Sequence, residues 1–417
     1  MQISQFGKNI LTLFTGSVIA QAVPILISPI LTREYSPNAF GEYAFYLSIV
    51  TIMSVFATCR YDLAVMIADD EKKSNAVMAL SISISISVTV LLLLVGVIIS
   101  FLDYLNNYIT FIYLGAIQVG MIGIYNTLYH KLNRDSLFKQ ISFAAFVQSF
   151  SIAIYQVLTG LWLKSGFNLA LGSFIGQLSA IIFILYFDKR ILTVLFQMSK
   201  DELIYVAKRF SKFPKYDLWA GLFNIGFQQI PVVLISSLFG KSYAGHFSLT
   251  QRILQVPTSL IGGSVLGAFR VKAIEEVGSK GECTSTFLKI LKFMFIMGIV
   301  PSIIILLAGK QIFVLIFGGQ WEMAGLFSQI MIVMFFLKFI TSPLTYMFYI
   351  AERQNWNFIG QILFIISTIV SFFVGYYYKD IIIALIIYTV TNSILYIIYL
   401  FISYLFAKGL YADKTEN

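Results

Sequence analysis

The sequence predicts an all-α integral membrane protein with twelve transmembrane helices, and three observations support this fold class. First, 58% of the 417 residues are hydrophobic and only 12% are charged, whereas soluble domains carry about 25% charged residues. Second, the mean hydropathy is +0.84. Third, the hydrophobic residues gather into runs that each meet or approach the roughly 17 to 25 residues needed to cross a bilayer.

These apolar runs follow one another along the whole chain, with short polar connections between most of them. In order, they are residues 9–32, 43–59, 74–102, 104–130, 140–163, 165–187, 218–240, 242–269, 293–309, 323–351, 354–378 and 381–407. The eighth run is interrupted by Arg252 and the tenth by Lys338, whereas the other runs contain no charged residue.

The distribution of basic residues predicts the topology. An even number of spans places both termini on the same side, and 22 of the 29 lysines and arginines fall in the termini and connections of that side. Only five fall on the other side, and the remaining two are Arg252 and Lys338. The positive-inside rule therefore predicts that both termini are cytoplasmic. The net charge of +9 indicates contact with anionic lipid headgroups rather than nucleic acid.

The longest connection divides the chain near its middle. Ser199 and Glu202 within it form a capping-box pattern, and apolar residues follow at helical spacing. We therefore expect an amphipathic helix on the inner leaflet; an ordinary polar linker is the alternative. The predicted domains are an N-terminal six-helix lobe (1–190), a cytoplasmic amphipathic linker (191–217) and a C-terminal six-helix lobe (218–417).

A weak internal repeat supports two lobes. The segment 21–25 (QAVPI) in the first run matches 228–232 (QQIPV) in the seventh. Both runs start from the cytoplasm, so the repeats are parallel, an arrangement with a central site between the halves. Pro24 and Pro231 occupy matching positions, which makes them candidate kink and gating sites; static kinks are the alternative.

The basic residues inside or beside the runs are the candidate binding residues. A charge at membrane depth costs about 2.5 to 3.5 kcal/mol on insertion scales and usually faces a cavity or a partner. No acid lies within any run, so Lys338 and Arg252 predict an anionic substrate. Arg60 and Arg33, at span ends, are candidates for substrate uptake and release, although basic residues there often contact headgroups. Asp62 and Glu34 could simply pair with these two arginines.

Motifs for catalysis or metal binding are absent from the sequence. It contains no Walker A motif, no G-x-S-x-G and no H-E-x-x-H. The two cysteines and two histidines have no metal-ligand spacing. The prediction is therefore that the protein is not an enzyme and holds no metal ion or other cofactor.

Several segments, in order along the chain, resemble a known family. They are 28–37 (SPILTREYSP), 40–44 (FGEYA), 60–64 (RYDLA), 248–254 (SLTQRIL), 257–262 (PTSLIG), 317–321 (FGGQW) and 342–344 (SPL). Together they resemble the Wzx-type polysaccharide flippases of the multidrug/oligosaccharidyl-lipid/polysaccharide exporter superfamily. The resemblance implies a V-shaped, MATE-like bundle of two lobes with a cationic central cavity.

The same resemblance implies a function. It implies alternating-access transfer of undecaprenyl-diphosphate-linked oligosaccharide repeat units to the outer leaflet of the bacterial cytoplasmic membrane, for O-antigen, capsule or exopolysaccharide synthesis. The expected partners are this lipid-linked glycan, membrane lipids, and a polysaccharide polymerase with its chain-length machinery. Coupling to H⁺, Na⁺ or the membrane potential is also implied, and Asp62, Glu34 and Glu42 are the candidate acids for ion coupling.

Two alternatives stay open at this point. One is a cation-coupled multidrug exporter of the same fold, although drug cations favour buried acids and this chain buries bases. The other is a membrane polysaccharide polymerase, which generally needs a long outer loop or an outward-facing catalytic cluster. The predicted outer connections are all short.

Overall fold

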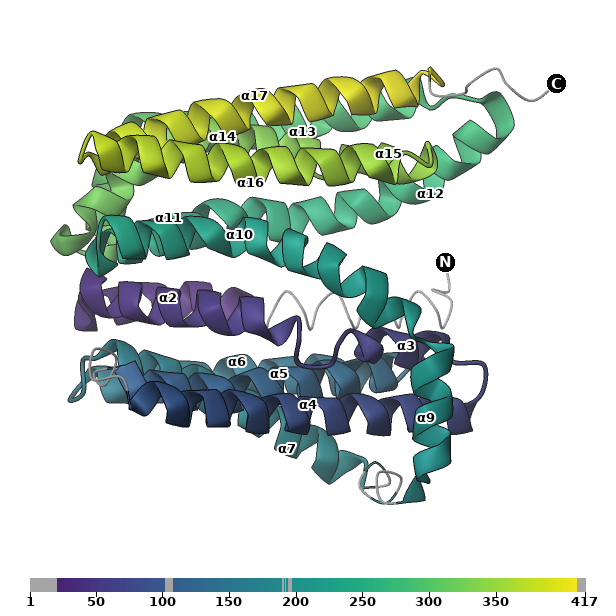
Figure 1. Ribbon diagram of the computed structural model, residues 1–417. Helices are drawn as coiled ribbons and strands as arrows, with labels where there is room; N and C mark the ends of the chain where they lie inside the picture. Colours follow the sequence, from purple (N-terminus) through teal and green to yellow (C-terminus); the bar gives the residue numbers. More distant parts are fainter. Residues whose placement is uncertain (1–20, 102–107, 190, 192, 194–196, 411–417) are drawn as a thin grey trace. The chain divides into compact units, whose positions relative to one another are not determined.

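The computed structural model describes residues 21–101, 108–189, 191, 193 and 197–410, and within them the regular structure is helical, with no strand (Figure 1). Nine helices in this part of the chain are long and apolar enough to cross a membrane. The predicted all-helical membrane architecture is therefore confirmed. The count of twelve spans and the cytoplasmic side of the termini stay predictions.

The chain forms two compact units, Met1–Gln229 and Ile230–Asn417. Their junction falls between Gln229 and Ile230, inside helix α10 (Leu218–Leu238) and one residue before Pro231. The domain boundaries predicted from the sequence stay a prediction, because the units are defined by packing and not by membrane topology. Each unit is described below by itself.

Several helices of the first unit begin with a side-chain cap. Residues 21–34 are helical. They are followed by α2 (Pro37–Ser54), α3 (Tyr61–Ile67), α4 (Glu71–Ser100), α5 (Ile109–Arg134), α6 (Phe138–Gly160), α7 (Gly166–Phe187), α9 (Lys200–Arg209) and the π-helical turn η2 (Phe213–Asp217) before α10. The side chains of Ser36, Asp70 and Ser165 accept backbone N–H groups at the starts of α2, α4 and α7. Such caps satisfy donors that have no partner within the helix.

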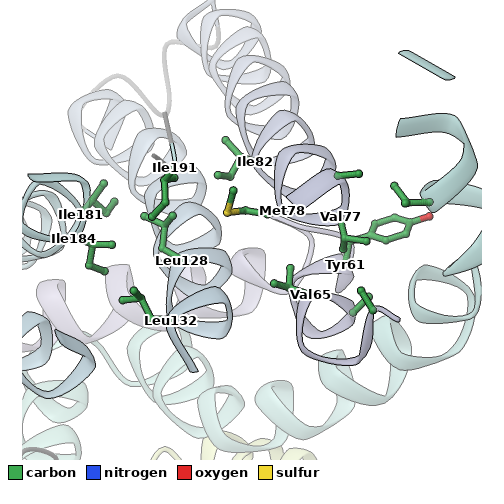
Figure 2. Packing of buried hydrophobic residues seen from close by; sticks show 14 of the residues in the cluster. Tyr61, Val65, Val77, Met78, Ile82, Leu128, Leu132, Ile181, Ile184 and Ile191 are labelled. Atoms are coloured by element: carbon green, nitrogen blue, oxygen red, sulfur yellow. The ribbon is translucent and has the colours of Figure 1, made fainter. Parts of the chain in front are cut away.

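The core of this unit lies where α3, α4, α5 and α7 meet. Figure 2 shows Val65 of α3, Met78 of α4, Leu128 of α5 and Ile184 of α7 among its side chains. Leu128 is fully buried. Helices α4 and α5 approach each other so closely that a Cβ on Gly123 of α5 would collide with Ser85 of α4.

Helix α9 completes this core from the side. The predicted capping box is confirmed, because Ser199 and Glu202 exchange both of its hydrogen bonds. Val206 and Phe210 are buried in the core cluster, so the apolar face of α9 packs on protein rather than on lipid. Ile204 and Tyr205 remain about half exposed. Figure 1 shows α9 crossing the ends of α3 and α4.

Several helices of the second unit are interrupted by short turns. After the end of α10 come α11 (Lys241–Pro257), the π-helical turn η3 (Thr258–Gly262), α12 (Gly263–Lys280), α13 (Thr284–Phe317), η4 (Gly319–Trp321), α14 (Glu322–Thr341), η5 (Leu344–Tyr346), α15 (Met347–Ile350), α16 (Gln354–Tyr377) and α17 (Ile381–Ala407). Helix α14 packs against α11, α13 and α17. It therefore lies at the centre of this unit.

The predicted span 323–351 is not one straight helix. Helix α14 ends at Thr341, and a 3-10 turn and the short α15 follow. The cause is Pro343, which has no N–H to donate to the preceding turn and whose ring would clash there. Lys338, which interrupts the predicted run near its middle, therefore lies close to the end of a helix.

Candidate functional site

Lys338 lies in the last turn of α14, where it is half-buried. Its ammonium lies 5.5 Å from the centre of the Phe335 ring. It forms no ion pair or hydrogen bond with another side chain in the described part of the chain. A cation is favoured near a helix C-terminus, where backbone carbonyls carry partial negative charge. This position lowers the free energy of burying the Lys338 ammonium but provides no negative charge to neutralise it.

Arg252 is the second cation of this unit, and it lies in the middle of α11. It is also half-buried, and among the described residues it has neither a hydrogen-bond partner nor an acidic partner. Thus the structure leaves both predicted membrane cations without an acid from the described chain. That arrangement is what the anionic-substrate hypothesis requires.

The two cations nevertheless lie at different depths. The segment from α11 through η3 runs parallel to α14. The Thr250 hydroxyl of α11 donates to the Ala324 carbonyl at 2.8 Å, and further along Ile261 of η3 packs against the cluster that contains Phe339 and Ile340 of α14. Lys338 is therefore level with about residue 261, roughly 15 Å along the axis from Arg252 at 1.5 Å per residue. Both side chains lean toward their own N-termini, so the offset persists. A single diphosphate does not occupy both at once.

Arg60 sits in a break between two helices of the first unit. Cys59 and Arg60 have φ values of 47° and 66°, a left-handed conformation that is uncommon for residues other than glycine. The Arg60 Nε atom lies 2.8 Å from Oδ2 of Asp217, and about a quarter of the arginine side chain is exposed. Arg60 therefore forms its ion pair with Asp217 and not with Asp62.

Asp62 instead forms a buried cluster with two other side chains. The Thr58 hydroxyl donates to its Oδ1 at 2.6 Å, and His130 Nε2 lies 3.5 Å from its Oδ2. Burial raises the pKa of the Asp62 carboxyl, but hydrogen bonding with His130 and Thr58 and the charge of Arg60 outweigh burial and lower it. The His130 Nδ1 atom is buried without a hydrogen-bond partner among the described residues.

The other predicted acids lie at the opposite end of α2. Glu34 pairs with Lys164 at 2.8 Å, so the expected pair with Arg33 is wrong, and Arg33 is exposed. Glu42 lies against Gly166, where a Cβ would meet its side chain at 2.5 Å. Along α2 (Pro37–Ser54), Glu42 lies twelve residues, roughly 18 Å, from the end of the helix that precedes Asp62, and Glu34 lies further away, before the helix begins. The three acids therefore do not form one ion site.

The two predicted gating prolines both lie within helices. Pro24 is in the helical segment 21–34, and its carbonyl accepts the Ser28 hydroxyl at 2.6 Å. Pro231 is buried in α10, next to the junction of the two units. Their role in gating stays a prediction. Among the described residues, no three histidine, cysteine or acidic side chains gather in a way that could hold a metal ion.

The sequence did not predict that His130 contacts Asp62 or that Asp217 pairs with Arg60. His130 is 68 positions from Asp62, and Asp217 is 157 positions from Arg60. Neither lies in a motif with its partner. The only local signal is that His130 and Asp217 stand at the ends of apolar runs, as Arg60 and Asp62 do, which makes a meeting at one end of the unit geometrically feasible.

The sequence and the fold were compared with those of known proteins. A family model described as polysaccharide biosynthesis protein matches residues 30–326, whereas no curated protein matches the sequence. An inward-facing multidrug resistance MATE transporter of the MOP superfamily is similar over 95% of this chain and 96% of its own, at 13% identity and a TM-score of 0.69. The lipid II flippase MurJ, in an inward closed conformation, is similar over 97% of this chain and 94% of its own, at 12% identity and a TM-score of 0.71.

A third similar structure is a MOP superfamily transporter from Pyrococcus furiosus, described as having a binding pocket of reverse polarity that suggests a different function. It covers 97% of this chain and 96% of its own, at 13% identity and a TM-score of 0.52. These likenesses show that the chain has the fold shared by MATE transporters and MurJ. The predicted MATE-like fold class is therefore confirmed.

Proposed function

Because the chain belongs to the family of polysaccharide biosynthesis proteins, we propose that it is a flippase for an anionic, lipid-linked oligosaccharide. The substrate is an undecaprenyl-diphosphate-linked repeat unit, which moves from the cytoplasmic to the outer leaflet of the bacterial cytoplasmic membrane. The observation that carries this proposal is the pair of half-buried cations, Lys338 and Arg252, without acidic partners among the described residues. Removing a charge from water is costly unless an opposite charge compensates for it.

The different depths of the two cations support a two-step route. With the predicted topology, Lys338 lies near the cytoplasmic end of α14 and Arg252 lies closer to the outer side. The diphosphate binds Lys338 first and passes to Arg252, whose guanidinium offers a bidentate fork to phosphate oxygens. The polyprenyl tail stays in the lipid throughout.

The membrane potential favours this direction of transfer. With the cytoplasm negative, each negative charge that moves outward gains about 2.3 kcal/mol per 100 mV. A diphosphate carrying about two charges is therefore driven outward without further coupling. Where an ion is coupled as well, we propose Asp62 as its site, because Asp62 is buried beside His130, whereas Glu34 is already paired with Lys164.

The proposal is tested by following a fluorescent undecaprenyl-diphosphate oligosaccharide in proteoliposomes. Lys338→Ala and Arg252→Ala are compared with Lys280→Ala and Arg270→Ala, which remove the same charges from exposed positions of α12. Loss of transfer in Lys338→Ala and Arg252→Ala but not in the two controls, with all four variants folded, supports the cationic route. Equal transfer in all four variants contradicts that route. Transport of drug cations without glycan transfer overturns the flippase in favour of a multidrug exporter.

A further inference from the structure

A cavity lies at one end of the second unit, between the α10–α11 and α16–α17 connections and the start of α14. Its volume is about 800 Å³, within the range of small-molecule binding pockets. Five aromatic side chains line it, and we name them the aromatic cradle: Phe239, Tyr243, Phe373, Tyr376 and Tyr377. Phe373, Tyr376 and Tyr377 are exposed by at least half. Their faces are therefore available to a ligand.

Lys379 brings a charge to the cradle at a structural cost. Its φ of 54° is left-handed, and it ends α16 with two backbone hydrogen bonds, from Lys379 to Tyr376 and from Asp380 to Gly375, both 3.0 Å long. Glycine adopts this conformation without steric strain. Among the described residues the Lys379 side chain forms no ion pair. It is also one of the five basic residues on the predicted outer side.

Asp380 adds an acceptor beside this cation. Its Oδ1 accepts the backbone N–H of Ile382 at 2.7 Å, which caps α17 and holds the carboxylate at the cavity. Oδ2 has no hydrogen-bond partner in the described chain. The cavity thus combines aromatic faces, tyrosine hydroxyls, one ammonium donor and one carboxylate acceptor.

We propose that the aromatic cradle binds a saccharide unit of the translocated glycan. The C–H face of a pyranose ring packs on an aromatic face, while its hydroxyls donate to Asp380 and accept from Lys379. Aromatic side chains also gather at membrane interfaces, where a lipid headgroup is the competing ligand. The Asp380 carboxylate repels a lipid phosphate, whereas a sugar hydroxyl needs such an acceptor. This assignment rests on the proposed flippase function, and it adds a glycan subsite at the predicted outer side.

The test measures binding of two lipids to the full chain in nanodiscs. One is the undecaprenyl-diphosphate oligosaccharide extracted from the source bacterium, and the other is undecaprenyl diphosphate without sugar. The wild type is expected to bind the glycan form about tenfold more tightly, and Tyr376→Ala or Tyr377→Ala to remove most of this difference, since aromatic anchors often dominate binding. Tyr205→Ala is the matched control, because Tyr205 of α9 is exposed and does not line the cavity.

Two results overturn the glycan subsite. One is equal binding of both lipids by the wild type, and the other is an equal loss of both lipids in Tyr376→Ala and Tyr377→Ala, which makes the cradle a lipid site. Binding of neither lipid by the wild type contradicts the proposed function itself, and the subsite with it. Lys338→Ala is expected to weaken both lipids alike, so loss of the diphosphate site is distinguishable from loss of the sugar site.

Discussion

The Arg60 Nε atom lies 2.8 Å from Oδ2 of Asp217, which ties the break between α2 and α3 to the residue directly before α10. A Cβ on Gly221, one turn into α10, would lie 3.3 Å from the guanidinium. Arg60 is thus held against the start of α10 by both charge and packing. Any substrate that uses Arg60 must compete with Asp217 for it.

This competition gives the first prediction. Asp217→Asn releases the Arg60 charge, so capture of the diphosphate lipid is expected to strengthen, whereas Arg60→Ala weakens it. The pair is partly exposed, and its loss is expected to lower the free energy of unfolding by no more than about 1 kcal/mol. Proteoliposome transfer at varied substrate density measures capture. Unchanged capture in Asp217→Asn would show that Arg60 has only a structural role.

The two membrane cations give a second prediction, based on their different depths. Lys338→Ala is expected to weaken binding from the cytoplasmic leaflet about tenfold, roughly 1.4 kcal/mol, because the first of the two diphosphate contacts in the second unit is lost. Arg252→Ala is expected to preserve that binding and slow the subsequent transfer. Equilibrium binding and single-turnover transfer, measured on the same preparations, separate the two steps. Identical defects in both variants would contradict the two-step route.

The Asp62 cluster gives a prediction for stability. Asp62 is 4% exposed, so Asp62→Asn, which leaves Thr58 and His130 without a carboxylate, is expected to cost about 1 to 3 kcal/mol at pH 7. Because folding lowers the pKa of Asp62, its stabilisation is present above the unfolded-state pKa of about 4. It is lost as the pH falls through the lower folded-state value.

Denaturant unfolding of wild type and Asp62→Asn at several pH values checks this. The difference in stability between the two proteins should shrink in acid, while Asp201→Asn, an exposed control on α9, should differ little from wild type at any pH. A difference that stays constant down to pH 3 would argue against the assigned role of the carboxylate.

Helix α9 gives a prediction about local stability. Ser199→Ala removes the cap and is expected to cost about 1 kcal/mol, seen as faster hydrogen exchange in α9. The bond from Lys72 and the Ser199 N–H lower the pKa of Glu202 to about 2. The support that Glu202 gives to α9 is therefore present at neutral pH and lost in acid, as the pH falls from about 4 toward 2. A hydrogen-exchange rate in α9 that changes with neither the Ser199→Ala substitution nor the pH would contradict the assigned roles of Ser199 and Glu202.

The core of the first unit gives the last prediction. Leu128 is fully buried among side chains of several helices, so Leu128→Ala is expected to lower stability by about 2 to 5 kcal/mol. Leu94→Ala in α4 is the control, because Leu94 is 57% exposed. Thermal unfolding in one detergent compares the two variants. Similar losses would mean that lipid contact and protein packing contribute equally at these positions.

Much of the fold could be predicted because its causes are local. Each apolar run is long enough to span, and a backbone inside a bilayer must satisfy its own hydrogen bonds, so helices are the available structure. The α9 capping box involves residues three positions apart, and it formed as predicted. The composition alone was sufficient for the class of protein.

The sequence by itself therefore determined the helical nature of the apolar runs, the capping box of α9 and the presence of two cations in apolar segments. Only the tertiary structure decided that Asp62 meets His130, that Arg60 meets Asp217, and that Lys338 and Arg252 lie at different depths. The physical reason is that contacts between helices depend on their rotation and register. A shift of a few residues along an axis, at 1.5 Å each, exchanges one partner for another without changing the pattern of any helix.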